Sequence, residues 1–228
     1  MRLLVLGGTG MLGFQFLRTC IKRGLDVHTV VRSKKRLEGT LPQLIHSSIH
    51  EIDDIRTVAL LDQLLQEIQP THLVNCIGIV KQSELASDYI ESITLNALLP
   101  HQLQLLAKKN GCKLIHISTD CVFSGQKGNY LETDHSDAYD LYGKSKFLGE
   151  VGYGNALTLR TSIIGHETSK ETHGLVEWFL AQKGTIKGFK RAIFSGFTTL
   201  ELTRLILDVA PSWEEMIMEM KQDIEQYS

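Results

Sequence analysis

The sequence predicts an α/β fold in which helices cover both faces of a parallel sheet. Three observations carry this prediction. Short apolar runs alternate with helical patterns, glycine or proline closes several of the segments, and the first run leads directly into a glycine-rich turn. Strands that alternate with helices form βαβ units with right-handed crossovers. We therefore expect one doubly wound domain over residues 1–165 and a smaller C-terminal lobe over residues 166–228.

The expected strands are short apolar runs that suit burial on both faces of a sheet. They cover residues 2–6, 26–31, 72–77, 113–118 and 156–160, with a further strand just before Asp53. The expected helices cover residues 10–23, 58–68, 84–110, 139–151, 173–182 and 199–209. A β-like segment spans residues 186–197, and its aromatic residues either pack in a core or stack on a nucleotide base. A last helix is expected from Ser212, which has capping-box spacing with Glu215.

Composition and charge argue against several classes of partner. The net charge is −2 and no long run carries one sign, so there is no electrostatic case for nucleic acid or an anionic membrane. The four cysteines form no C-x-x-C pair, which is typical of free thiols in a reducing compartment. The histidines show no metal-ligand spacing. No apolar run is long enough to span a bilayer, and a strand begins almost at Met1 without a leader, so we expect a cytoplasmic protein.

The first turn carries the pattern G-x-x-G-x-x-G, formed by Gly7, Gly10 and Gly13. Glycine allows the backbone to turn tightly and to approach a pyrophosphate, and the helix N-terminus offers free N–H groups. The strand before and the helix after this turn favour a dinucleotide-binding site over a tight turn that binds nothing. The other cofactor-binding candidates in this turn are Thr9, Met11 and Leu12.

The end of the second strand bears on the choice of cofactor. An acidic residue there would accept hydrogen bonds from the ribose of NAD, but this chain has Arg32, followed by Lys34 and Lys35. These cations are suited to a 2′-phosphate, which favours NADP(H) and leaves NAD(H) possible. The alternative interpretation is a solvated basic loop.

Two further strand ends are expected to contribute to the same site. Asp54 and Ile55 follow the third strand, where a carboxylate could accept a hydrogen bond from the adenine amino group. Cys76, Ile77 and Gly78 end the fourth strand, at the edge where ligands bind in open α/β sheets.

The fifth strand and the helix after it carry a more specific pattern. The strand ends in STDCVFSG (118–125), and the helix places Tyr142 and Lys146 four residues apart, so that they are neighbours on one helical face. With the glycine spacing, this arrangement resembles the extended branch of the short-chain dehydrogenase/reductase superfamily. The stretches GNYLETD (128–134), YGKSKFLGE (142–150) and LRTSIIG (159–165) are similar to the dTDP-4-dehydrorhamnose reductase group. The resemblance covers about residues 1–200 and is most specific up to about residue 165.

This resemblance implies a Rossmann-type fold and an NADP(H)-dependent reduction of a nucleotide-linked 4-keto-6-deoxy sugar. It implies that Tyr142 protonates the carbonyl oxygen while hydride reaches C4. Lys146 would lower the pKa of the tyrosine and hold the nicotinamide ribose. Thr119 would hydrogen-bond the same oxygen, and Asn96 would support the lysine through water. Lys81 and Gln82 could face a sugar diphosphate or water.

The chain departs from the resemblance near its C-terminal end. Extended members place a further stretch between a helix like 199–209 and a final helix, and here the two adjoin. We therefore expect a shortened substrate lobe. Two alternatives to a reductase stay open: an NADP-binding regulatory subunit without catalysis, and a nucleotide-sugar epimerase. A homodimer is possible, through the helices expected at 84–110 and 139–151.

Overall fold

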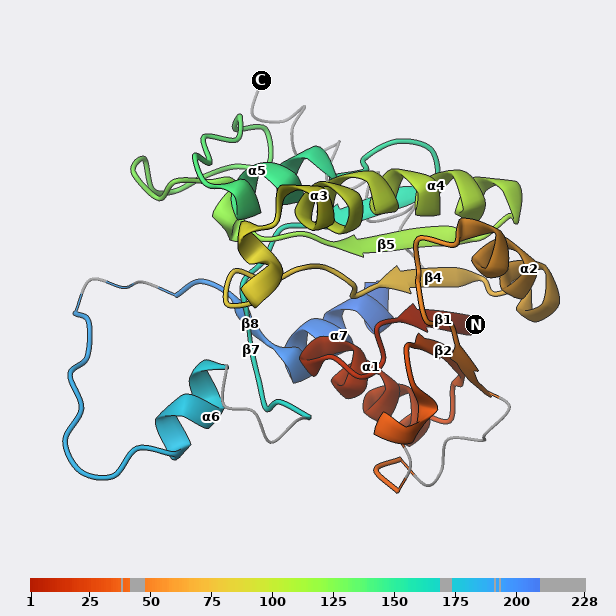
Figure 1. The fold of residues 1–228 in the computed structure, drawn as a ribbon, viewed down its shortest axis with the longest axis horizontal. Coiled ribbons are helices and arrows are strands. Elements are labelled where there is room, and N and C mark those ends of the chain that lie inside the picture. The colour runs from red at the N-terminus through yellow and green to blue at the C-terminus, as the bar shows by residue number, and fades with distance from the viewer. Residues whose placement is uncertain (38, 42–47, 169–173, 191, 193, 210–228) are drawn as a thin grey trace.

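The computed structural model describes residues 1–37, 39–41, 48–168, 174–190, 192 and 194–209. Its centre is a six-stranded sheet in which every pair of neighbours is parallel, with the order β3-β2-β1-β4-β5-β6 (Figure 1). The strands are β1 (Arg2–Leu6), β2 (Asp26–Val31), β3 (Ile49–Glu51), β4 (His72–Asn75), β5 (Lys113–Ile117) and β6 (Ala156–Leu159). The predicted doubly wound, Rossmann-type fold is confirmed. The strand order reverses between β1 and β4, and such a switch point is where open α/β sheets bind their ligands.

Alternate residues of β1 pack into the two cores of the molecule, one on each face of the sheet. Leu3 and Val5 lie in the core that contains helix α1 (Met11–Lys22). Leu4 and Leu6 lie in the opposite core, together with the buried residues of the helices α2 (Val58–Ile68) and α4 (Leu99–Lys109). Burial on both faces explains why these strands are continuous apolar runs.

Helix α7 (Thr199–Val209) packs beside α1 on the first of these faces. Its residues Leu202, Ile206 and Leu207 are buried in the same core as Leu17. A segment that the sequence assigns to the smaller lobe therefore stabilises the sheet domain. The division at residue 165 stays a prediction.

The expected helix at 84–110 is wrong in its first part, where the structure has four consecutive elements. These are a 3₁₀ turn η3 (Glu84–Ser87), α3 (Tyr89–Ser92), a π-helical segment η4 (Ile93–Leu98) and α4. Asp88 separates the first two, because its carboxylate accepts hydrogen bonds from the backbone N–H groups of Ile90 and Glu91. This side chain caps α3 and so sets the helix start at Tyr89, five residues later than the apolar periodicity suggests.

The helix that carries Tyr142 is α5 (Leu141–Leu148), which is shorter than the expected 139–151. Asp140 is its N-cap and accepts a 2.7 Å hydrogen bond from the N–H of Gly143. Gly149 ends the helix.

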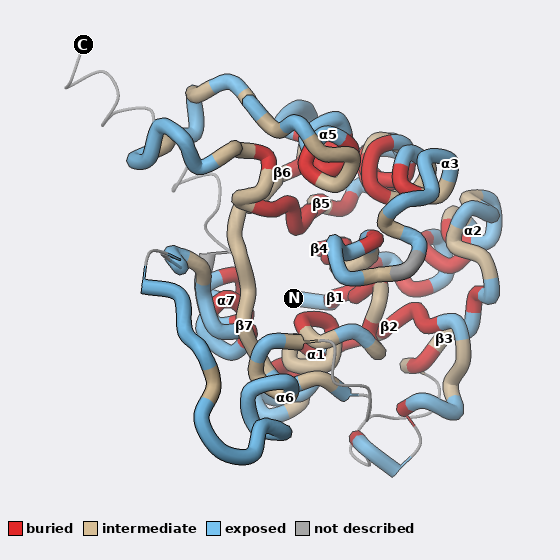
Figure 2. Tube along the Cα trace, turned by 60° about the vertical axis from the view of Figure 1, so that its left-hand side comes forward, coloured by how far each residue is buried: buried red, intermediate tan, exposed pale blue. Residues whose placement is uncertain are grey.

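The segment between β6 and α7 is mostly exposed (Figure 2). A second, two-stranded parallel sheet pairs β7 (Ile163–Ile164) with β8 (Phe197–Thr198), and α6 (Leu175–Leu180) lies between them in sequence. Among the described residues of the β-like segment expected at 186–197, the structure places only Phe197 in a strand. His173 and the helix expected from Ser212 lie outside the described residues. Within the described part of the chain, no helix combines the length and apolar character that crossing a membrane requires.

Candidate active site

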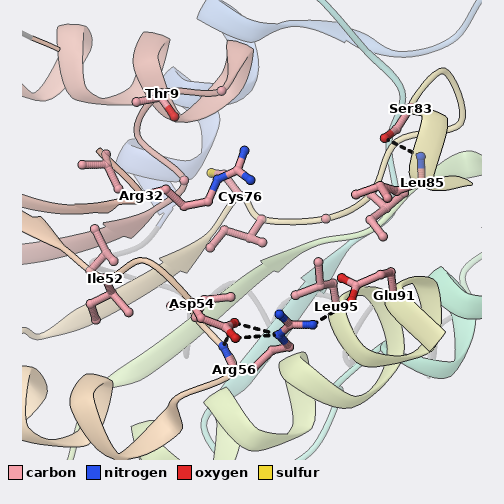
Figure 3. Close-up of a pocket in the computed structure, with 18 of the residues that line it drawn as sticks. Thr9, Arg32, Ile52, Asp54, Arg56, Cys76, Ser83, Leu85, Glu91 and Leu95 are labelled. Carbon is pink, nitrogen blue, oxygen red and sulfur yellow. Dashed lines mark hydrogen bonds and ion pairs between the residues drawn. The ribbon is translucent and has the colours of Figure 1, made fainter. Parts of the chain in front are cut away.

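A cleft of about 400 Å³ lies at the carboxyl ends of β1 to β4, at the strand-order switch point (Figure 3). Nine of the residues expected from the sequence to bind a cofactor line this cleft: Gly7, Thr9, Gly10, Arg32, Asp54, Ile55, Cys76, Ile77 and Gly78. Met11, Leu12 and Gly13, which begin α1, do not line it. Lys34 and Lys35 are also absent from its lining, so Arg32 is the member of that basic stretch that faces the cleft.

The glycine turn closes on itself in front of α1. The N–H of Gly7 donates to the carbonyl of Val30 at 3.1 Å, and the N–H of Gly10 donates to the carbonyl of Gly7 at 3.0 Å. Gly7 has φ +85°, a left-handed conformation that favours glycine. Gly10 is the N-cap of α1 and offers no side-chain acceptor. The first N–H groups of α1 therefore keep the capacity to bind an anion.

An arginine that sequence reasoning missed lies in the same cleft. Arg56 donates to both oxygens of Asp54, at 2.7 and 2.9 Å, and to Glu91 of α3 at 2.6 Å (Figure 3). These hydrogen bonds hold the pKa of the Asp54 carboxyl below its usual range. Asp54 is thus already paired at the position where the sequence suggests an adenine contact. The spacing of Asp54 and Arg56 is a signal in the sequence, but the Glu91 contact spans 35 residues and depends on the fold.

Lys146 is almost fully buried, with 5% of its surface exposed. Its Nζ donates a 2.7 Å hydrogen bond to the carbonyl of Ile117, the last residue of β5. Burial lowers the pKa of this ammonium to about 8, against the opposing effect of the Glu150 carboxylate. Lys146 is therefore a cation at neutral pH that loses its charge far more readily than a lysine on the surface.

Tyr142 precedes Lys146 by one helical turn and is half-buried. Burial raises the pKa of its phenol, and a hydrogen bond with Thr119 lowers it only in part. The sequence suggested that Lys146 would lower this pKa, but the shift has the opposite direction, because desolvation is the largest effect and the lysine charge is not among the causes. Thr119 also accepts a hydrogen bond from the N–H of Cys121 at 3.1 Å. The structure thus brings Tyr142 and Thr119 into contact at the end of β5.

Asn96 lies in the π-helical segment η4 and is fully buried. Its amide accepts from the N–H of Ile79 at 2.8 Å and donates to the carbonyl of the same residue at 3.1 Å. A Cβ on Gly78 would lie 3.1 Å from Asn96 Oδ1 and 3.5 Å from Lys146 Nζ, so both polar groups face the backbone of Gly78. The π-helical turn, a feature common at functional sites, has no signature in the sequence that we recognised.

Lys81 forms an ion pair within the protein. Its Nζ pairs with the carboxylate of Asp140 at 2.8 Å, and Asp140 caps α5 two residues before Tyr142. The pair is exposed, so its contribution to stability is small. It joins the loop after β4 to the start of the helix that carries Tyr142 and Lys146.

The comparison with known protein families matches residues 1–187 to the RmlD substrate binding domain. The chain belongs to this family. Among its curated relatives, the dTDP-4-dehydrorhamnose reductase of Burkholderia thailandensis is 26% identical over 95% of this chain and 63% of its own length. Methionine adenosyltransferase 2 subunit beta of Danio rerio is 33% identical over 65% of this chain and 42% of its own length. This RmlD-domain chain therefore spans less than two thirds of the length of either relative.

Solved structures support the same fold. The crystal structure of a hypothetical dTDP-4-dehydrorhamnose reductase from Sulfolobus tokodaii aligns with a TM-score of 0.74 at 24% identity, over 92% of this chain and 72% of that one. The dTDP-4-dehydrorhamnose reductase of Bacillus anthracis in complex with NADP aligns with a TM-score of 0.57 at 24% identity, over 73% of this chain and 56% of that one. At this level of identity, the two structures establish the fold of the RmlD-domain chain.

The buried charge of Lys146 should destabilise the folded protein, in a manner that depends on pH. We expect Lys146→Met to be more stable than wild type at pH 7, by up to about 3 kcal/mol, because the folded pKa of about 8 lies below that of an unfolded lysine. Between about pH 8 and about pH 10.4, the unfolded protein keeps the proton of Lys146 while the folded protein has lost it. Wild type therefore gains stability as pH rises through this range, and its stability difference from Lys146→Met shrinks. Urea unfolding of both proteins at pH 7 and pH 9.5 measures this. A difference that does not change with pH would contradict the buried-cation assignment.

Proposed function

We propose that this protein is an NADP(H)-dependent reductase of a nucleotide-linked 4-keto-6-deoxy sugar. The observation that carries the proposal is the cluster of Tyr142, Thr119 and Lys146 at the end of β5, on the same edge of the sheet as the glycine-turn cleft. The bound cofactor would supply hydride to C4 of the sugar. The similarity to the dTDP-4-dehydrorhamnose reductases of Burkholderia and Bacillus supports the substrate class, and the NADP complex of the latter supports the cofactor.

The protonation states of the site suit this reaction. Burial keeps Tyr142 as a neutral phenol at neutral pH, which is the form that donates a proton to a carbonyl oxygen. Lys146 is a cation below about pH 8, and its donors beyond the one used by Ile117 can bind ribose hydroxyls. The phenolate left after proton transfer would be stabilised by this neighbouring cation. Thr119 would orient the carbonyl oxygen beside the phenol.

The direct test is NADPH oxidation, followed by nicotinamide absorbance, with purified protein and a dTDP-4-keto-6-deoxyhexose. We expect turnover with NADPH. A protein that binds NADPH without oxidising it would overturn the reductase and favour the second candidate, an NADP-binding regulatory subunit. The similarity to the Danio subunit is the observation that favours this candidate. Interconversion of the C4 epimers of a nucleotide sugar, without net oxidation of NADPH, would instead identify an epimerase.

Arg32 provides a test of cofactor preference. We expect Arg32→Gln to weaken NADPH binding by about 10- to 100-fold and to leave NADH binding nearly unchanged, because a hydrogen bond to a charged group contributes about 1.5–3 kcal/mol. The measurement is a titration of nicotinamide fluorescence with each nucleotide. Lys35→Gln is a matched control, since Lys35 carries the same charge but does not line the cleft. Equal loss in the two variants would indicate a general effect of the basic loop.

Self-association is a further proposal. Leu98, Leu105 and Leu148, on η4, α4 and α5, are 50%, 63% and 61% exposed. Apolar side chains exposed on adjoining helices are consistent with a homodimer formed through these helices. Sedimentation analysis at several protein concentrations would test it.

A further inference from the structure

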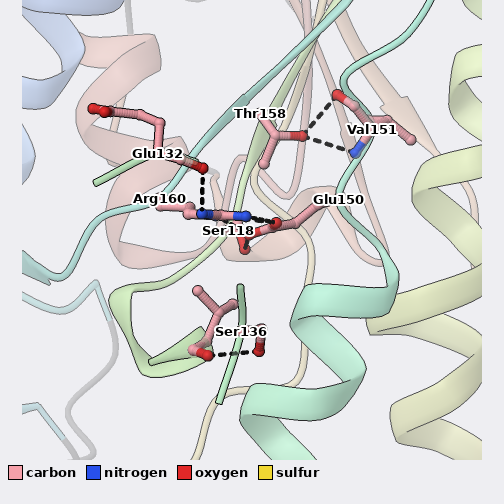
Figure 4. A network of polar contacts seen from close by, with 8 residues as sticks. Ser118, Glu132, Ser136, Glu150, Val151, Thr158 and Arg160 are labelled. Atoms are coloured by element: carbon pink, nitrogen blue, oxygen red, sulfur yellow. Dashed lines mark hydrogen bonds and ion pairs between the residues drawn. The ribbon is translucent and has the colours of Figure 1, made fainter. Parts of the chain in front are cut away.

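A partly buried ion pair lies beside the end of β5, and the reaction outlined above makes no use of it (Figure 4). Glu150 follows α5, and Arg160 follows β6; their side chains are 12% and 23% exposed. Arg160 Nε donates to Glu150 Oε1 at 2.9 Å and Nη2 donates to Oε2 at 2.7 Å. Ser118 Oγ donates to the same carboxylate at 2.9 Å. The Glu150 carboxylate therefore accepts a bidentate pair of hydrogen bonds from Arg160 and a further hydrogen bond from Ser118.

Arg160 is itself fixed by two further contacts. It donates to the backbone carbonyl of Glu132 at 3.1 Å, and its guanidinium lies 5.1 Å from the centre of the Phe123 ring. Through Arg160, the end of β6 therefore contacts both the residue after α5 and the loop between β5 and α5. Because each donor group is positioned from a different segment, the Glu150 carboxylate has little freedom to turn away.

Two links connect this pair to Lys146. Glu150 comes four residues after Lys146, with the turn at Gly149 between them. Ser118, which holds Glu150, directly follows Ile117, whose carbonyl accepts the hydrogen bond of Lys146 Nζ. Glu150 also favours the charged form of Lys146.

The other groups that face Lys146 supply no negative charge at neutral pH. Burial raises the pKa of the Cys76 thiol, at the end of β4, to about 12. Burial holds the pKa of His116, on β5, well below its usual range. Tyr142, on α5, stays a neutral phenol, and Asn96, on η4, has no charge. Glu150 is thus the anion that opposes the desolvation of this lysine.

We propose that Glu150 is a positioning residue that keeps Lys146 protonated, and that Arg160 and Ser118 hold its carboxylate in place for this purpose. The catalytic value of that charge rests on the proposed function, in which Lys146 binds the cofactor ribose. The electrostatic coupling between the two residues does not depend on any reaction, so it is open to a test without cofactor or substrate.

The test is an NMR titration of protein with ¹³C-labelled lysine, in which the Lys146 signal is assigned by its loss in Lys146→Met. We expect Lys146 to titrate near pH 8 in wild type, apart from the surface lysines at about 10.4. Glu150→Gln should lower this titration by about one pH unit or more, because removal of a nearby opposite charge destabilises the ammonium form. Glu150→Asp, which restores the charge, should recover most of the shift.

The comparison variants separate charge from folding. Glu201→Gln removes a carboxylate from an exposed pair with Arg204 on α7, and should leave the Lys146 titration unchanged. Glu150→Gln leaves Arg160 partly buried without its partner, so Glu150→Gln/Arg160→Met is the second variant. It removes the same carboxylate and should also lower the titration. An unchanged Lys146 titration in Glu150→Gln or in Glu150→Gln/Arg160→Met overturns the proposal. A lowered titration in a protein without reductase activity would keep the coupling and reject the proposed function.

Discussion

Tyr142→Phe is expected to lower turnover by about 10²- to 10⁴-fold, the usual contribution of a positioned general acid. The substitution removes the phenolic hydroxyl and keeps the ring. Because the raised pKa of Tyr142 keeps its proton at neutral pH, the hydroxyl is the group in this site suited to protonate the carbonyl oxygen. NADPH affinity should stay near that of wild type, since Lys146 and the glycine turn are unchanged. Steady-state rates and NADPH fluorescence titrations of the two proteins measure both quantities.

Tyr139→Phe is the matched control for this experiment. Tyr139 lies three residues earlier, just before α5, and is 75% exposed, so the same loss of a hydroxyl should leave turnover unchanged. Equal turnover in Tyr142→Phe and wild type would remove Tyr142 from the reaction. A parallel loss of NADPH binding would mean that the phenol acts in binding the cofactor and not as the acid.

Gly13→Ala is expected to destabilise the glycine turn, lowering the free energy of unfolding by about 1–3 kcal/mol or more. A Cβ at this position would lie 2.2 Å from the carbonyl oxygen of Gly7, and this neighbour is backbone that is held in a tight turn. Relief of the clash requires α1 to move away from β1, which also displaces the N–H groups suited to the pyrophosphate. Urea unfolding gives the stability, and NADPH titration reports the loss of binding.

Gly10→Ala, in the same turn, provides the control for stability. A Cβ on Gly10 would lie 3.4 Å from the Gly7 carbonyl, an ordinary contact, and its φ of −78° suits alanine. The free energy of unfolding should therefore change little in this variant. Similar destabilisation by the two substitutions would contradict the close packing that we assign to Gly13.

Much of the fold was predictable because its signals are local. The strand before Gly7 and the helix that follows Gly10 are expected from apolar periodicity and turn chemistry, and the structure confirms both. The helix expected from residue 84 begins at Tyr89, because the side chain of Asp88 competes with the periodic pattern. The π-helical turn around Asn96 was not predictable, since the same apolar spacing suits an ordinary helix.

The candidate site was predictable to a similar extent. The spacings of the glycine turn and of the Tyr-x-x-x-Lys pattern point to residues that the structure places at one edge of the sheet. Arg56 and the Glu150–Arg160 pair were missed. Arg56 contacts Glu91 from 35 residues away along the chain, and Glu150 and Arg160 are 10 residues apart. No local pattern marks such contacts.

The sequence by itself determined the order of strands and helices, the glycine turn and the two side chains, Tyr142 and Lys146, that define the proposed chemistry. Each of these depends on residues a few positions apart. Only the tertiary structure decided the pKa values of these two side chains. Burial raises the pKa of Tyr142 and lowers that of Lys146 to about 8. Desolvation depends on every atom that surrounds a group, and in this fold those atoms come from strands and helices that are distant in sequence.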